Sequence, residues 1–158
     1  VVAAIQGHAI AGGLILALCC DYRVAAAHDC KIGLTEVRVG VPFPAVALAV
    51  LRAELDPATA RVLALGGRNV DPATALGRGV IDELQPREQV LSRALHVAQD
   101  HSQSPRGAYA EVKQQLRRDT LRAIETTLAS GDDPALPFWF LPDVKHTIRA
   151  VLSKQRDT

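Results

Sequence analysis

Methionine is absent from the 158-residue sequence, and aromatic residues make up only 4% of it. Because residue 1 is not a methionine, it is not a translation start, and we expect the chain to be the remainder of a longer protein. With so few aromatics, a core has to be built from Ala, Val, Leu and Ile. The 48% of apolar residues is ample for such a core and too high for a disordered chain. The length predicts about one domain.

The sequence also has no surplus of charge, no membrane-spanning run and no cysteine framework. Lys and Arg number 18 against 17 Asp and Glu, which argues against a nucleic-acid binder. The longest hydrophobic stretch, residues 9–20, contains Gly12 and Gly13 and is shorter than the roughly 20 residues that cross a bilayer. No charged segment precedes it, so it is not a secretory signal. Three cysteines favour reduced thiols, and we expect a cytoplasmic protein that binds neither nucleic acid nor membrane.

Apolar runs near the start of the sequence predict a small parallel sheet. Residues 1–5 have no polar face, which is typical of a strand that is covered on both sides. We expect a short helix over residues 14–19 and further strands over residues 22–26 and 31–33. This order indicates a βαβ-like unit and an α/β fold class.

From Pro44 onward the pattern becomes helical. Asp56-Pro57 and Asp71-Pro72 each provide an N-cap followed by proline at the first helical position. We expect helices over 45–55, from Asp56-Pro57 to Gly66-Gly67, from Asp71-Pro72 to Gly77, and over 88–103, 107–129 and 143–154. A further strand is expected over 79–84, and the glycine and prolines of residues 130–134 predict a break.

A glycine-rich stretch, residues 7–13, is the first candidate for chemistry. Glycines at a strand-to-helix junction let backbone N–H groups approach a ligand, and the positive end of the helix dipole reinforces them. Gly12 and Gly13 are therefore candidates to hold an oxyanion such as an enolate. The alternative is that the pair only allows a helix to pack tightly on a sheet, because glycine pairs alone are a weak signal.

Glu36 is the second candidate, because it is the only carboxylate between residues 30 and 51. A carboxylate in an apolar pocket has a raised pKa and is suited to moving protons. The alternative is an exposed loop acid, which is the commoner environment for glutamate.

The remaining titratable residues suggest no third site. Possible metal ligands lie close together in the sequence at Cys19, Cys20, His28 and Cys30. Adjacent cysteines do not easily close one tetrahedral site, so we expect no metal. Basic pairs at i,i+4 spacing, such as Lys113 and Arg117, are interpreted as a solvated helix face.

Several segments are shared with a known family. They are VAAIQGHAIAGG at 2–13, CDYRVA at 20–25, TEVRVG at 35–40, ALGRGVID at 75–82 and VLSKQR at 151–156. With these segments the sequence resembles the crotonase superfamily, the enoyl-CoA hydratase/isomerase family. The resemblance covers essentially the whole chain, although the middle helices are generic.

The resemblance implies a crotonase-like core of repeated ββα turns followed by C-terminal helices. On this basis residues 1–90 are the C-terminal part of the α/β core, and residues 91–158 are a helical trimerisation region. A homotrimer or a dimer of trimers is therefore expected. The implied substrate is an acyl-CoA thioester, and no separate cofactor is expected because coenzyme A is part of the substrate.

Site residues follow from the same resemblance. In the family, two backbone N–H groups hold the thioester oxygen while an enolate develops. One of them maps onto Gly12, which is followed by Gly13, and the other lies in an earlier loop that this chain lacks. Lys154 matches a family lysine that reaches a coenzyme A phosphate.

The departures from the family favour one reaction. Family hydratases use two glutamates to hold and activate water. The first falls on Ile15 and the second on Glu36, while Phe43 replaces a glycine that helps to place the water. Hydration needs a positioned nucleophile, whereas moving a double bond needs one base that takes a proton from one carbon and returns it to another. Some single-acid isomerases of the family keep a glutamate at this position.

We therefore expect an enoyl-CoA isomerase in which Glu36 is the acid/base and Gly12 donates to the thioester oxygen. The apolar Ile15 and Phe43 would line the acyl pocket. A hydratase remains an alternative if another residue binds water. A non-catalytic acyl-CoA-binding or assembly subunit is the second alternative, which Ile15 favours. Without its second oxyanion donor, the chain alone should be poorly active or inactive.

Overall fold

The computed structural model describes the backbone of residues 1–154 and the side chains of residues 1–150. Two small sheets form its centre, in agreement with the α/β class. The first is parallel and has the order β1-β3-β6, with β1 at Val2–Ile5, β3 at Tyr22–Ala26 and β6 at Glu83–Gln85. The second has the order β2-β4-β5, with β2 at Ala9–Ile10, β4 at Ile32–Gly33 and β5 at Asn69–Val70. In it β2 and β4 are parallel, and β5 is antiparallel to β4.

Two consecutive ββα turns make up the first third of the chain. The first consists of β1, β2 and α1 (Gly12–Leu18), and the second of β3, β4 and α2 (Ala45–Glu54), with the 3₁₀ turn η1 (Glu36–Val39) before α2. The first strands of the two turns pair in one sheet and the second strands in the other. This is the repeated ββα core that the resemblance implies.

The predicted helices are present with small shifts at their ends. They are α3 (Pro57–Ala60), continued by the π-helical turn η2 (Arg61–Leu65), α4 (Pro72–Gly77), α5 (Val90–Ser102) after the 3₁₀ turn η3 (Arg87–Gln89), α6 (Arg106–Ser130), the 3₁₀ turn η4 (Leu136–Phe140) and α7 (Pro142–Lys154). Both Asp-Pro starts are confirmed. The Asp56 carboxylate accepts from the N–H groups of Ala58 and Thr59, and Asp71 accepts from Thr74 N–H at 2.8 Å.

The strand predicted over 79–84 is wrong in its position. Gly79 has φ +68° and ends the turn after α4, and Val80 N–H still donates to the carbonyl of Ala75. Val80 and Ile81 are buried in this turn rather than in a strand, and β6 begins only at Glu83. Their apolar character reflects burial in the core, which sequence periodicity does not distinguish from a buried strand.

The core lies between the two sheets and the helices that cover them. The largest fully buried side chains are Leu14, Leu18, Val24, Ile32, Leu34, Leu63, Val80, Ile81 and Val90. Helix α5 packs against β1 and β3, and α1 packs against α2. As the composition predicts, the core is built from aliphatic residues rather than aromatic ones.

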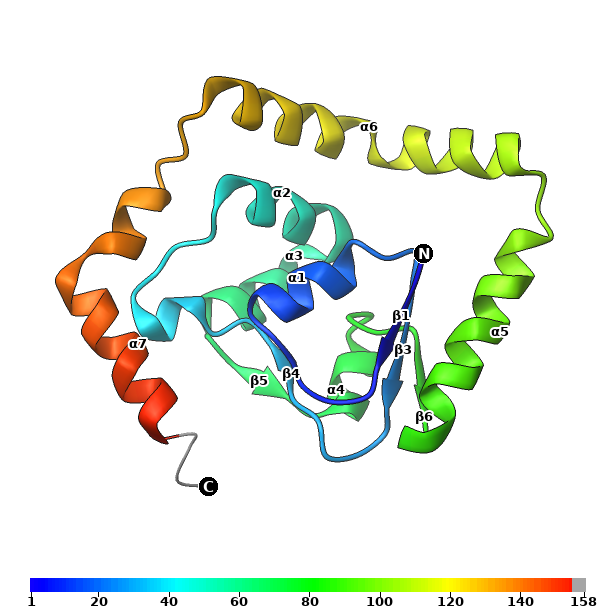
Figure 1. The fold of residues 1–158 in the computed structure, drawn as a ribbon, viewed down its shortest axis with the longest axis horizontal. Helices are drawn as coiled ribbons and strands as arrows, with labels where there is room; N and C mark the ends of the chain where they lie inside the picture. The colour runs from blue at the N-terminus through cyan, green and yellow to red at the C-terminus, as the bar shows by residue number, and fades with distance from the viewer. Residues whose placement is uncertain (155–158) are drawn as a thin grey trace.

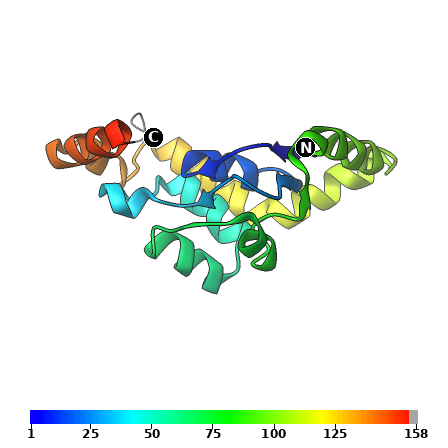
Figure 2. The same ribbon diagram turned by 90° about the horizontal axis from the view of Figure 1, so that it is seen from below.

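Helices α5, α6 and α7 form an outer frame around this core (Figure 1). Viewed from below, α5 and α7 lie at opposite ends of the molecule (Figure 2). Helix α6 has 25 residues, and none of them is buried. Exposed apolar side chains on it include Leu116, Leu121 and Leu128. Within the described part of the chain, no helix is both long and apolar enough to cross a membrane.

Candidate active site

Glu36 is buried, although it begins a short 3₁₀ turn near the surface. The chain leaves β4 at Gly33, passes the buried Leu34 and reaches Glu36, whose exposed fraction is 6%. Its Oε2 atom is also buried and has no hydrogen-bond partner among the described residues. The alternative of an exposed loop acid is therefore wrong. A buried carboxylate oxygen without a partner costs free energy and is free to bind a proton.

The surroundings of Glu36 raise the pKa of its carboxyl group. Burial is the main cause, because it disfavours the charged form. Hydrogen bonds from the backbone N–H groups of Glu36 and Thr35 act in the opposite direction but do not cancel it. A carboxylate with a raised pKa is a stronger base than an exposed one, which suits it to proton transfer.

The glycine pair begins α1 directly after β2. Both glycines are exposed, and a methyl group added at Gly12 or Gly13 would meet no atom within 4 Å. Tight packing within this chain therefore does not explain the pair. The first N–H groups of a helix have no partner in the helix, so those of Gly12 and Gly13 are available to a ligand.

Ala11 fixes the direction in which the glycine pair leaves β2. Its backbone has φ 54° and ψ −127°, a conformation that non-glycine residues rarely adopt. Hydrogen bonds hold it there, because Ala11 N–H donates to Gly33 O at 2.9 Å and Ala11 O accepts from Leu14 N–H and Ile15 N–H.

The glycine pair and Glu36 lie at the same edge of a sheet. Strands β2 and β4 are parallel neighbours, with Ile10 paired to Gly33. The glycine pair follows the carboxyl end of β2, and Glu36 follows the carboxyl end of β4. Loops at the carboxyl ends of adjacent parallel strands are a common place for ligand sites. This edge therefore carries both the buried Glu36 carboxylate and the exposed glycine pair.

The two apolar departures from the family pattern pack close to the core. Ile15 lies one turn into α1, and Phe43 lies between η1 and α2. Both side chains are partly buried and contact the core cluster. Neither offers a hydrogen bond to water.

The other candidates are outside the site or outside the described side chains. Lys154 ends α7, and its side chain lies outside the described residues. Cys19, Cys20 and Cys30 are unpaired thiols, and Cys30 donates to the carbonyl of Ala26. Within residues 1–150, no three His, Cys, Asp or Glu side chains are grouped as a metal site.

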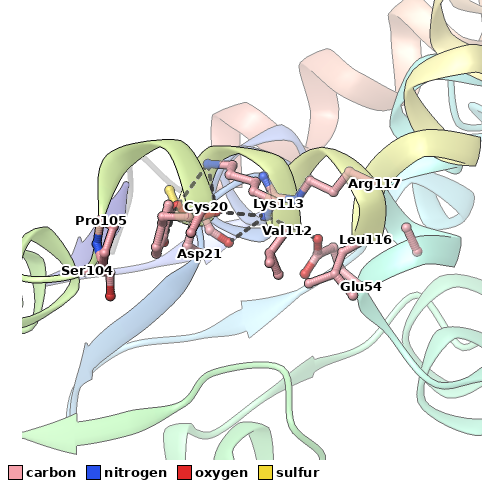
Figure 3. Close-up of a pocket in the computed structure, with 12 residues that line it drawn as sticks. Cys20, Asp21, Glu54, Ser104, Pro105, Val112, Lys113, Leu116 and Arg117 are labelled. Carbon is pink, nitrogen blue, oxygen red and sulfur yellow. Dashed lines mark hydrogen bonds and ion pairs between the residues drawn. The ribbon is translucent and has the colours of Figure 1, made fainter.

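The interpretation of Lys113 and Arg117 as a solvated face is wrong. Both point from α6 to Asp21 at the start of β3, with Lys113 Nζ 2.7 Å and Arg117 Nη2 3.3 Å from Asp21 Oδ1 (Figure 3). Arg117 also donates to the carbonyl of Cys19 at 3.0 Å. The i,i+4 spacing puts the two side chains on one face, but spacing alone does not reveal that this face meets the half-buried Asp21.

These ion pairs lie beside a cleft of about 700 Å³ between α6 and the core, lined in part by Cys20, Glu54 and Val112 (Figure 3). Burial on its own raises the pKa of Asp21, but hydrogen bonds, of which the one from Lys113 is the largest, outweigh it and lower the pKa. Arg23, two residues along β3, pairs with Asp82 at 3.0 Å. The acidic and basic residues of the CDYR segment therefore anchor β3 to its neighbours.

Comparison with known proteins extends these observations. A family model described as enoyl-CoA hydratase/isomerase matches residues 1–133. A probable enoyl-CoA hydratase of Mycobacterium avium is 37% identical over 112 residues, which cover 71% of this chain and 43% of that protein. The mitochondrial enoyl-CoA delta isomerase 1 of Mus musculus is 36% identical over 120 residues, which cover 75% of this chain and 42% of that protein. The chain spans less than half the length of these relatives.

Solved structures match over more of the chain. Human mitochondrial delta3-delta2-enoyl-CoA isomerase superposes with a TM-score of 0.88 at 29% identity, covering 99% of this chain and 61% of that one. The enoyl-CoA hydratase EchA3 of Mycobacterium ulcerans gives a TM-score of 0.75 at 36% identity, covering 79% and 54%. On its sequence and its fold alike, the chain belongs to the enoyl-CoA hydratase/isomerase family of the crotonase superfamily.

Proposed function

We propose that the full-length protein is an enoyl-CoA isomerase in which Glu36 carries the proton. The observation that supports this most directly is the buried Glu36 carboxylate with an unpartnered oxygen, at the same sheet edge as the Gly12 N–H group. Glu36 takes a proton from C2 of a 3-enoyl-CoA, and the electron pair moves onto the thioester oxygen. Gly12 N–H stabilises that oxygen. Glu36 then returns the proton to C4, and the double bond shifts to C2–C3.

The apolar residues beside the site favour isomerisation over hydration. Ile15 and Phe43 offer no hydrogen bonds to an attacking water, whereas a single carboxylate is sufficient to move a proton between two carbons. The relatives include both hydratases and isomerases, so the names alone do not choose between the reactions.

The same proposal covers assembly and compartment. We propose a homotrimer or a dimer of trimers that binds acyl-CoA in the cytoplasm. Support for assembly comes from α6, which has no buried residue and exposes Leu116, Leu121 and Leu128. The unpaired thiols of the described residues suit a reducing compartment.

Turnover by the full-length protein tests the reaction. With 3-enoyl-CoA we expect conversion to 2-enoyl-CoA, and with 2-enoyl-CoA little hydration. Glu36→Gln keeps the side-chain shape but cannot act as a base, so it should lower kcat by about 10²- to 10⁴-fold. The matched control is Glu88→Gln, at an exposed glutamate, which should leave kcat unchanged.

Three outcomes would overturn this proposal. Dominant hydration of 2-enoyl-CoA would make the protein a hydratase. Binding of acyl-CoA without turnover would make it a non-catalytic subunit. Unchanged isomerisation by Glu36→Gln would assign the proton transfer to another residue.

A further inference from the structure

The segment that joins Glu36 to α2 has few hydrogen bonds of its own. It contains Gly40, with φ +79°, and the two prolines Pro42 and Pro44, which have no N–H to donate. Val41 N–H donates to the carbonyl of Glu36 at 3.1 Å, which closes the end of η1. Beyond that bond, the carbonyl of Pro42 and the N–H group of Ala45 depend on partners from elsewhere in the chain.

Those partners come from the C-terminal arm, residues 133–144, nearly 100 residues away. Trp139 Nε1 donates to the carbonyl of Pro42 at 3.2 Å. The Asp133 carboxylate accepts from Ala45 N–H at 2.7 Å and from Ala135 N–H at 2.9 Å. Val144 is buried, and its Cγ2 atom lies within contact distance of the Gly40 position.

Two of these contacts satisfy polar groups of the segment, the Pro42 carbonyl and the Ala45 N–H group. Ala45 begins α2, so its N–H has no partner inside the helix, and the N-cap Pro44 has no side chain that caps it. The Asp133 carboxylate accepts this hydrogen bond instead, and its negative charge lies at the positive end of the helix dipole. Hydrogen bonds to a charged group are among the stronger ones in proteins.

The two ends of the segment are held by different parts of the chain. Arg38 in η1 donates to the carbonyls of Gly66 and Gly67, so the Glu36 end is fixed to the turn before β5. The Phe43 end is fixed to the C-terminal arm through Trp139 and Asp133. Losing the arm would therefore release the Phe43 end while Glu36 stays attached to the core.

We propose that Trp139 and Asp133 are positioning residues, which hold residues 42–45 so that Glu36 and Phe43 keep a dry, fixed arrangement beside the substrate. This proposal rests on the proposed isomerase function. It gives the C-terminal helical region a role inside its own subunit in addition to assembly. The arm acts through the segment and touches no reacting atom.

Single substitutions in the full-length protein test the positioning role. Trp139→Phe keeps a ring but removes the donor, and Asp133→Ala removes the acceptor. Because misplacement by about 1 Å can cost roughly 100-fold, we expect kcat to fall by about 10- to 100-fold with little change in KM. Asp133→Asn keeps an acceptor oxygen and should restore most of the activity. Asp132→Ala, at an exposed neighbouring acid whose side chain makes no hydrogen bond, is the matched control.

The pH profile separates positioning from general damage. Water that enters beside Glu36 reduces the effect of burial, so the acidic limb of kcat/KM should move to lower pH in Trp139→Phe and Asp133→Ala. A fall in kcat with an unmoved limb, or activity equal to that of Asp132→Ala, would contradict the proposal.

Amide hydrogen exchange distinguishes failure of this proposal from failure of the isomerase function. Loss of the Trp139 hydrogen bond should speed exchange over residues 36–45 by about 2- to 12-fold, and loss of the charged Asp133 acceptor should speed it further, whatever reaction the protein catalyses. Faster exchange in a protein that does not isomerise would retain the positioning and reject the function. Exchange equal to that of Asp132→Ala would reject the positioning itself.

Discussion

At the scale of single residues, the burial of Glu36 costs free energy and also underlies the proton-transfer role that we propose for it. The carboxylate is taken out of water without a partner for Oε2, which destabilises the charged form in the folded chain. The same desolvation strengthens it as a base. A side chain kept in such a place is typical of a functional site, where stability is exchanged for reactivity.

The pH dependence of turnover should report this environment. In the proposed isomerisation Glu36 must be deprotonated at the start, so kcat/KM for 3-enoyl-CoA should fall on the acidic side as its carboxyl group is protonated. Because burial raises its pKa, the limb should lie above the ordinary value of 4.5. A pH series on the full-length protein measures it, and a limb at or below 4.5 would show that Glu36 is solvated or is not the base.

The stability of Glu36→Gln should differ from that of the wild type in a pH-dependent way. Below pH 4.5 the carboxyl group is protonated in both the folded and the unfolded chain, so the penalty for its charge is absent. As pH rises through the raised pKa of Glu36 in the folded state, the buried charge lowers the free energy of unfolding of the wild type but not of the variant. Urea unfolding at pH 4 and pH 7 should therefore show the variant more stable only at pH 7. A constant difference would contradict the sign of the pKa shift.

The sequence predicts the environment of Glu36 because every neighbour from residue 30 to residue 51 other than Lys31, Thr35 and Arg38 is apolar or small. It does not predict that of Lys113 and Arg117. Their partner Asp21 is over 90 residues away, and helical spacing says nothing about which element a face meets.

At the scale of elements, the sequence predicts helices and strands correctly where the interactions that define them are local. The Asp-Pro N-caps locate α3 and α4, since the capping bonds span only two or three residues. Strands β2 and β5 have two residues each, too few to show any alternation, and the sequence does not predict them. The strand predicted over 79–84 is misplaced because Val80 and Ile81 are buried in a turn.

Helix α6 should loosen when Asp21 is neutralised. Asp21→Asn leaves Lys113 and Arg117 without their carboxylate, which should lower the free energy of unfolding by about 1.5–3 kcal/mol at neutral pH. The pKa of Asp21 is lowered from its ordinary value of 3.8, so the wild type keeps this stability above pH 4 and loses it as pH falls below 3.8. The difference in the free energy of unfolding between wild type and variant should therefore disappear at acidic pH.

Denaturant unfolding of the full-length protein measures this gap, with Asp119→Asn as the control at an exposed acid of the same helix. If Asp21→Asn is no less stable than Asp119→Asn, the ion pairs do not anchor α6.

At the scale of the whole molecule, packing within the described chain does not explain the exposed apolar side chains of the outer frame. None of the 25 residues of α6 is buried, and Leu116 and Leu128 are 81% and 69% exposed. The amphipathic pattern of α6 is weak in the sequence because its charged core-facing side chains make ion pairs. In the proposed assembly a second subunit would cover these leucines, and a single sequence does not specify that partner.

Light scattering on the full-length protein tests the assembly. We expect a mass three or six times that of one chain, because the proposed trimer would cover the exposed leucines of α6. A monomer at micromolar concentration would contradict the trimer.

A structure of the full-length protein with a bound acyl-CoA tests the central claim most directly. The proposed mechanism predicts that the Glu36 carboxylate faces C2 and C4 of the acyl chain within about 3.2 Å, with Gly12 N–H on the thioester oxygen and no water between Ile15 and Phe43. A Glu36 side chain turned to bulk solvent, away from Gly12 and the acyl carbons, would contradict it.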